Sequence, residues 1–251
     1  MSTPFGALCD EYYVSSRLFL KLELSLQRET LLHFFDTIRK EFPSMRKFRR
    51  RDNGMFVLEE EPIETPSRRW LRLEPSSLRF GYYSPPDIDT AKAMSDVVFE
   101  HAPYHLTFSD IDFDYLELIY GFDMEYRGNH DQLVAETLYG DHPFANVLLG
   151  DEAVHTIECQ PYFGVALTPD CDIQAYVEVK GRTSSYEVRT GEFEPAPLSV
   201  FMTLRKYWGF GPPGTLLDAQ RQLFERADEF AANRVVPTLV NPLAHAIASR
   251  S

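Results

Sequence analysis

The sequence predicts an α+β protein of two tandem βαββββα halves that form a curved antiparallel sheet with helices on one side. Three observations predict it: several segments alternate apolar and polar residues, apolar stripes recur at helical spacing, and an Asn-Gly pair marks a tight hairpin. Residues 1–109 are expected to form the first half. Residues 110–251 are expected to form the second half with a C-terminal helix and tail, and the two halves are expected to make one compact unit. The same elements also allow a helix-grip arrangement, in which a curved sheet wraps around the long C-terminal helix.

The first strand is predicted over residues 17–24, where leucine occupies every second position. A helix follows, because apolar residues recur at helical spacing as far as Phe42. Ser25 is expected to cap the start of this helix, and Pro43 is expected to end it.

Four short strands complete the sheet of the first half. Residues 45–51 and 55–59 flank Asp52-Asn53-Gly54, and Asn-Gly supplies the positive φ angles of a tight hairpin turn. Residues 69–74 and 78–83 form two further strands after a loop that is rich in Pro and Glu. Asp87 then caps a helix with one apolar stripe, and Pro103 is expected to close it.

The second half is predicted to repeat this order. Alternating residues from Leu116 to Tyr126 indicate a long strand, and Asn129 with Gln132 is typical of a capped helix start. Four strand-like segments follow, over residues 154–167, 173–181, 185–190 and 198–208. A loop at residues 209–214 precedes the last helix, which begins near Thr215, and Pro237 and Pro242 are expected to interrupt the apolar tail.

Composition narrows the function classes. The chain of 251 residues has a formal net charge of −13, which repels nucleic acid and anionic membranes. No charged leader precedes an apolar signal core, and no apolar run reaches the ~18 residues of a membrane span. Three scattered cysteines fit a reducing compartment. We therefore expect a cytoplasmic protein without cofactor and without membrane contact.

One segment reverses the sign of the charge. Residues 39–80 contain eleven basic and seven acidic residues, a net charge of +4 in a chain of −13. Aromatic residues are interleaved with the basic ones, as in surfaces that stack bases or bind an anionic partner. The alternative is pairing of this hairpin with the acidic segment 59–61 or with a second copy, and we favour it. The candidate partner-binding residues are Arg46, Lys47, Arg49, Arg50, Arg51, Arg69, Trp70 and Arg72.

A second candidate site is acidic. Asp110, Asp112 and Asp114 alternate, so on an extended chain their carboxylates would share one face and could hold Mg²⁺ or Mn²⁺ for phosphoryl chemistry. A solvated strand face is the simpler interpretation of the same run.

Histidines offer two further, weaker candidates. His101 and His105 have a spacing that resembles a metal motif, but Pro103 is expected to break the helix that would align them. His130-Asp131 could supply a general base. No nucleophile motif or phosphate-binding glycine loop accompanies either pair.

Three stretches carry a resemblance that spans most of the chain. They are the closing helix with Val235-Val236-Pro237, Gly121-Phe122-Asp123 leading to Gly128-Asn129-His130-Asp131, and residues 199–202 leading to Tyr207-Trp208-Gly209. In element order, length and these stretches the chain resembles a sporadically distributed family of uncharacterised bacterial proteins of about 250 residues. That resemblance implies no activity. The order of elements is also similar to the saddle of TATA-binding proteins, an analogy of fold only.

These observations favour a non-enzymatic binding or assembly protein with a protein partner or a second copy as its ligand, because no catalytic set is complete in the sequence. Two alternatives stay open. One is a metal-dependent phosphohydrolase that uses Asp110, Asp112 and Asp114. The other is a nucleic-acid binder that uses Arg46 to Arg51, which the net charge disfavours.

Overall fold

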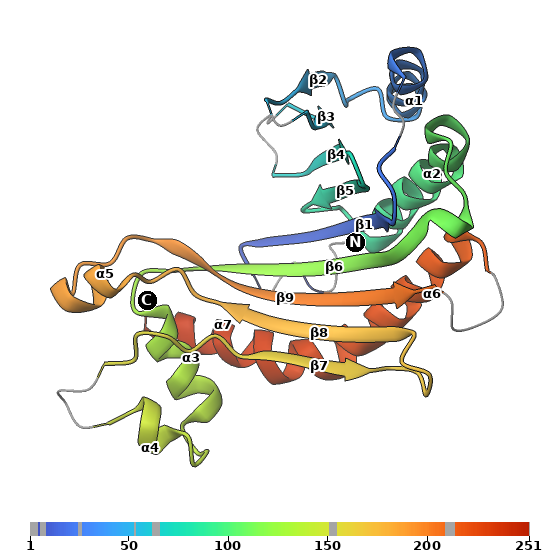
Figure 1. Ribbon diagram of the computed structural model, residues 1–251. Helices are drawn as coiled ribbons and strands as arrows, with labels where there is room; N and C mark the ends of the chain where they lie inside the picture. Colours follow the sequence, from blue (N-terminus) through green and yellow to red (C-terminus); the bar gives the residue numbers. More distant parts are fainter. Residues whose placement is uncertain are drawn as a thin grey trace.

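Figure 1 shows the computed structural model of the chain. It describes residue 5 and residues 9–24, 27–52, 54–61, 66–150, 155–208 and 214–250. The predicted cap Ser25, the turn residue Asn53, residue 154 and most of the loop at residues 209–214 lie outside this part of the chain.

The first half folds as β1 (Glu11–Leu20), α1 (Arg28–Glu41), β2 (Lys47–Arg50), β3 (Phe56–Glu59), β4 (Arg68–Glu74), β5 (Ser77–Tyr83) and α2 (Ile88–Leu106). This is the predicted order of elements. Gly54 adopts φ +82° in the turn between β2 and β3, as the Asn-Gly signal requires. Asp87 caps α2, because its carboxylate accepts a hydrogen bond from the Thr90 N–H at 2.7 Å.

The second half comprises β6 (Phe113–Tyr126), α3 (His130–Tyr139), α4 (Ala145–Leu148), β7 (Tyr162–Ala166), β8 (Ile173–Lys180), α5 (Ser185–Thr190), β9 (Ala196–Tyr207), α6 (Leu216–Phe230), a π-helical segment (Ala231–Val240) and α7 (Asn241–Ala248). The predicted cap of α3 forms, because the Asn129 side chain accepts from the Gln132 N–H.

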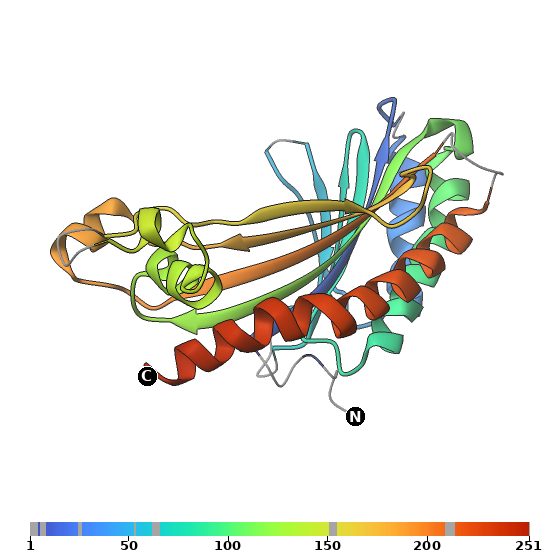
Figure 2. The same ribbon diagram turned by 90° about the horizontal axis from the view of Figure 1, so that it is seen from below.

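Within the described residues the nine strands form one antiparallel sheet, in the order β2-β3-β4-β5-β1-β6-β9-β8-β7. The first strands of the two halves, β1 and β6, pair at the centre, and each half extends outward from there. The sheet is curved, as Figures 1 and 2 show. The predicted α+β class with a curved antiparallel sheet is therefore confirmed.

The hydrophobic core lies between one face of this sheet and the helices. Alternate residues of the central strands point into it, among them Leu18, Leu118, Phe122 and Val200, all fully buried. Segment 216–248 forms one long helical element along this face (Figure 2), and α6 contacts both β6 and β9. The opposite face of the sheet is called the open face below.

One predicted strand is wrong. Residues 185–190 form the helix α5, whose start is fixed by a reciprocal pair of contacts: the Ser184 hydroxyl accepts from the Glu187 N–H, and the Glu187 carboxylate accepts from the Ser184 N–H. The second half therefore has three strands after its first helix, where the first half has four. Both halves begin with a strand and a helix, but the additional helices α4 and α5 lie among the later elements of the second half.

Several boundaries also differ from the predictions. Of the predicted strand 154–167, only Tyr162–Ala166 forms a strand, β7, within the described residues. The first strand runs over Glu11–Leu20, so it begins before residue 17 and ends before Leu22 and Leu24. α2 continues past Pro103 to Leu106. Pro237 does not interrupt the last helix, because it lies in the π-helical segment, whose wider turns relax the clash between a proline ring and the preceding carbonyl.

Among the described residues, no helix combines the length and the apolar character that crossing a membrane requires.

Candidate binding surfaces

The basic segment 46–51 lies at the β2 edge of the sheet, where its side chains have contacts within the molecule. Arg49 and Lys47 approach the Glu59 carboxylate of β3, at 2.7 and 3.8 Å. The guanidinium of Arg50 lies over the Phe56 ring. Glu59 belongs to the acidic segment 59–61, so this hairpin pairs in part with that segment.

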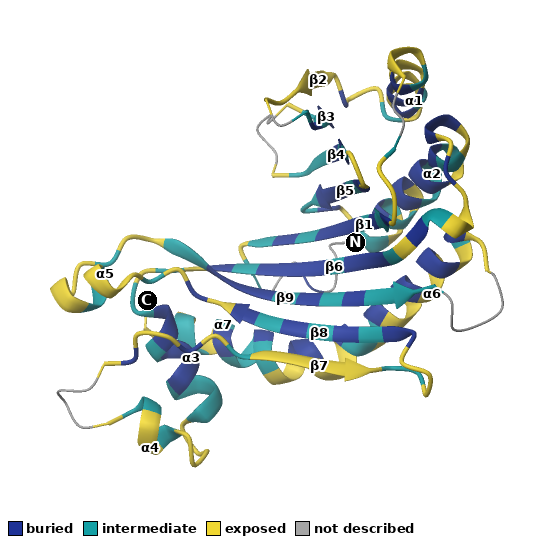
Figure 3. Ribbon diagram, in the orientation of Figure 1, coloured by how far each residue is buried: buried dark blue, intermediate teal, exposed yellow. Residues whose placement is uncertain are grey.

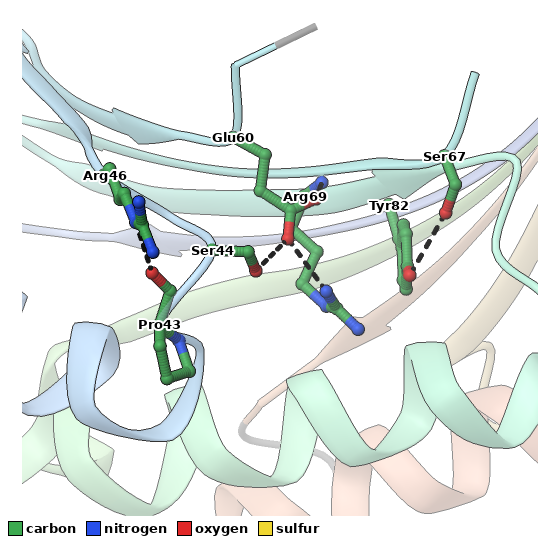
Figure 4. Close-up of polar contacts among 7 residues, drawn as sticks. All are labelled: Pro43, Ser44, Arg46, Glu60, Ser67, Arg69 and Tyr82. Atoms are coloured by element: carbon green, nitrogen blue, oxygen red, sulfur yellow. Dashed lines mark hydrogen bonds and ion pairs between the residues drawn. The ribbon is translucent and has the colours of Figure 1, made fainter. Parts of the chain in front are cut away.

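Two further candidates belong to different surroundings. The Arg46 Nε donates to the Pro43 carbonyl at 3.2 Å, near the end of α1. Arg69 is held by Glu60, which accepts from its backbone N–H at 2.6 Å and from its guanidinium at 2.8 Å, and which also accepts from the Ser44 hydroxyl (Figure 4). The Arg69 side chain points to the same face as buried Tyr82, away from Trp70 and Arg72.

A row of charged side chains crosses the open face of the sheet. Directly paired residues of neighbouring strands point to the same face. The pairing runs Arg72 (β4), Arg79 (β5), Arg17 (β1), Glu117 (β6) and Arg205 (β9). The structure thus places Arg72, one of the predicted binding residues, beside basic residues that were not predicted from the sequence.

Two of these arginines have carboxylate partners. Arg17 binds Glu74 at 2.6 Å and also contacts the Ser77 hydroxyl. Arg205 binds the buried Glu117 at 2.7 Å. The pKa of Arg205 is raised, because the hydrogen bond and the charge of Glu117 outweigh the cost of burial.

Aromatic side chains lie on the open face beside this row. Trp70 is 5% exposed and lies against Gly81 of β5, where an added Cβ would come within 2.7 Å of the Trp70 ring. Tyr13 lies in the same way over Gly121 of β6, where the corresponding distance is 2.2 Å. In both pairs the absence of a Cβ on the glycine leaves room for the ring from the neighbouring strand.

The predicted acidic face is not extended. Asp110–Asp112 forms a 3-10 turn, in which the Asp112 carboxylate accepts from the N–H and the hydroxyl of Ser109. Asp110 accepts from the Ile111 N–H, and Asp114 is exposed at the start of β6. Among the described residues, no group of three or more His, Cys, Asp or Glu side chains is arranged to hold a metal ion. The structure lends the phosphohydrolase hypothesis no geometric support.

His130 is occupied by structural hydrogen bonds. Its Nε2 lies 3.2 Å from the Tyr126 carbonyl, and its Nδ1 accepts from the Arg182 N–H at 3.2 Å. Burial lowers the pKa of this histidine, so the neutral ring fits both contacts. The neighbouring Asp131 accepts from the Cys159 N–H at 2.7 Å. These contacts join α3 to the end of β6 and to the segments that follow the helix.

The two edges of the sheet differ in chemistry. The β2 edge carries Lys47, Arg49 and Arg50 in four residues. The β7 edge carries no charge, and its side chains are exposed: Tyr162 by 57%, Phe163 by 52% and Val165 by 44%. Figure 3 shows β7 exposed along its length beside the buried centre of the sheet. Charged edges resist pairing with another chain, and bare apolar edges invite it.

Sequence reasoning missed Arg17, Arg79 and the β7 edge. Arg17 precedes Leu18 in the alternating segment, so the sequence indicates that its side chain points away from the core. Nothing in the sequence placed it beside Arg79, because that contact depends on the pairing of β1 with β5.

No protein-family model matches the chain, and no curated protein matches it with significant similarity. The fold and these surfaces define an α+β protein with a single curved antiparallel sheet. The resemblance to a bacterial family stays a prediction.

Proposed function

We propose that this chain is a non-enzymatic binding and assembly protein, and that it associates with a second copy of itself by pairing of the two β7 edges. The observation that carries the proposal is the uncharged, exposed apolar edge at Tyr162–Ala166. The opposite edge of the same sheet is protected by cations.

The hydrogen-bonding pattern of β7 supports this mode. The Leu167 N–H donates to the Ile173 carbonyl of β8 at 2.8 Å. Residues that exchange hydrogen bonds with a neighbouring strand alternate with residues that do not. The backbone groups of Tyr162, Gly164 and Ala166 therefore point away from β8, toward the outer edge.

The side chains of β7 are complementary to themselves across a twofold axis at Gly164. An antiparallel second copy centred there places Tyr162 opposite Ala166 and Phe163 opposite Val165. About six backbone hydrogen bonds would form, and aromatic–β-branched pairs of this kind stabilise adjacent strands. Such a dimer joins two nine-stranded sheets into one and satisfies both outer edges.

Light scattering coupled to size-exclusion chromatography tests the proposal. We expect a dimer in the wild-type protein, and a monomer in Val165→Lys, because each lysine would replace the apolar partner of Phe163 in the other copy and place a charge on the edge strand. Leu32→Lys is the matched control, since Leu32 on α1 is 43% exposed and Val165 is 44% exposed. A wild-type monomer at every concentration would refute the proposal.

Salt separates this mode from association through the basic hairpin. Apolar edge pairing persists at high ionic strength, whereas attraction between residues 46–51 and an acidic surface is screened. A dimer that dissociates with added salt, and that Val165→Lys leaves intact, would favour the hairpin.

A further inference from the structure

Arg72 and Arg79 lie side by side on the open face, and neither forms an ion pair with a carboxylate of the described residues. They are direct cross-strand partners, and Arg79 is also the partner of Arg17. Arg17 has its own carboxylate, Glu74. Within the part of the chain that the structure describes, neither Arg72 nor Arg79 has an ion pair, and the buried Nε of each lacks a hydrogen-bond acceptor.

Trp70 holds the two guanidinium groups in place. The Cζ atom of Arg72 lies 4.5 Å from the centre of a Trp70 ring, and that of Arg79 lies 5.3 Å away. Stacking on an aromatic face attracts a cation but gives its N–H groups no acceptor. The two guanidinium groups are therefore held in place, and the buried Nε of each has no acceptor among the described residues.

This arrangement has an electrostatic cost. Burial lowers the pKa of Arg79, and the positive charges of Arg17 and Arg72 lower it further. A chain with 38 acidic residues could have supplied a partner. Buried cations are usually paired, so an unpaired adjacent couple indicates a missing anion.

We propose that Arg72 and Arg79 bind a single phosphate group of a small phosphorylated molecule. Two arginines without an ion pair offer about two positive charges, and a phosphate monoester carries about −1.5 to −2 at neutral pH. Its oxygens match the fork of donors on a guanidinium. Assembly through β7 rests on a different observation, so either proposal can fail without the other.

The surroundings favour one phosphate over a polyanion. Glu74 lies two residues after Arg72 on β4, and Glu59 lies on the neighbouring strand β3. Glu117 lies on β6, which β1 separates from β5. These charges repel an extended strand of nucleic acid but leave room for one compact dianion, as does the net charge of −13.

Binding of inorganic phosphate and of phenyl phosphate, measured by calorimetry and by thermal unfolding, tests the site. Sodium chloride at equal ionic strength controls for screening. We expect millimolar phosphate to raise the melting temperature of the wild-type protein, and Arg72→Gln or Arg79→Gln to lose about tenfold or more in affinity. Arg46→Gln removes one charge outside the row and should bind as the wild type does.

Stability without ligand distinguishes a binding role from a packing role. Arg79→Gln removes a like-charge contact, so without phosphate it should unfold at or above the wild-type temperature, and Arg79→Lys should keep the fold but lose affinity. Three outcomes would overturn the proposal. The first is that Arg79→Gln binds phosphate as tightly as the wild type does. The second is that Arg79→Gln is destabilised by the same amount with and without phosphate. The third is that a single-stranded oligonucleotide binds more tightly than phenyl phosphate, in a manner that depends on Arg72.

Discussion

His33 of α1 and His105 of α2 face each other with their Nδ1 atoms 3.2 Å apart. One of these nitrogens must donate a hydrogen and the other must accept it, so the contact requires at least one neutral ring. His101 lies one helical turn before His105, with ring centres 6.0 Å apart, because α2 continues through Pro103. Three imidazoles thus meet where the first two helices pack.

Stability should fall in mildly acidic solution. The pKa of His105 is lowered from 6.5, first by burial and then by the charges of His33 and His101. Below about pH 6.5 the unfolded chain therefore binds more protons than the folded one. The stabilisation is complete above that pH and is lost as the pH falls through the lowered pKa. Burial lowers the pKa of His130 as well, which adds to the loss.

Thermal unfolding at pH 7.5 and pH 5.5 measures this effect. His105→Asn should lose less stability between the two values than the wild type does. The exposed His142→Asn should behave as the wild type. Equal losses in wild type and His105→Asn would show that the histidine contact does not govern the pH response.

Removal of the Tyr120 hydroxyl should be costly. This hydroxyl donates to the Asp228 carboxylate at 2.6 Å, and Lys92 binds the same carboxylate at 2.9 Å. Hydrogen bonds to charged groups contribute about 1.5–3 kcal/mol, so Tyr120→Phe should lower the free energy of unfolding by that amount. Urea unfolding measures it.

Tyr12 provides the matched control for Tyr120. Its ring is 2% exposed and packs beside Tyr120, but its hydroxyl has no hydrogen-bond partner among the described residues. Tyr12→Phe should therefore leave the free energy of unfolding unchanged or raise it, because a buried unsatisfied hydroxyl is removed. A loss as large as that of Tyr120→Phe would contradict this account.

Gly121→Ala should destabilise the centre of the sheet. The added Cβ would come within 2.2 Å of the Tyr13 ring, so the ring would have to leave its position on the open face. Overpacking of this kind costs about 1–3 kcal/mol. The double variant Gly121→Ala/Tyr13→Ala should lose less free energy of unfolding than the sum of the two single variants. Gly214→Ala is the control, because its added Cβ meets no atom within 4 Å. Additive losses in the double variant would indicate another cause.

Glu60→Gln should weaken the attachment of the first hairpins to α1. The Glu60 carboxylate joins Ser44 to both the backbone and the guanidinium of Arg69, and its side chain is only 10% exposed. The neutral amide weakens three hydrogen bonds to a charged acceptor, a loss of about 1.5–3 kcal/mol in the free energy of unfolding. Glu229→Gln, at a position that is 65% exposed, should have almost no effect in the same urea titration.

Local sequence signals predicted the first half well, because each of its elements is marked by short-range chemistry. Asn53-Gly54 fixes a hairpin, Asp87 caps a helix, and strict alternation marks the strands. In the second half, residues 185–190 include residues typical of strands, but Ser184 and Glu187 have the spacing of a helix start, and that signal is the one that decides the structure.

Proline was the main source of wrong helix ends. Pro103 lies in the last turn of α2 and Pro237 in a π-helical segment, and both helices are held by packing against neighbours. Propensity is a weak local preference that tertiary contacts override. The sequence alone contains no measure of those contacts.

The arginine couple was beyond local reasoning. The high density of charge at residues 46–51, where five of the six residues are basic, is visible in the sequence. Arg79 is a single basic residue in an apolar strand, and its relation to Arg17 and Arg72 depends on the register of three strands. Register over such separations is set by the whole sheet.

The helical element at residues 216–248 covers strands that were all synthesised before it. While the ribosome adds these roughly 33 residues, for about 2–7 s at common rates of translation, the apolar side of β6 and β9 has no cover. A nascent chain at that stage exposes the apolar face of the sheet, which is the kind of surface that chaperones bind.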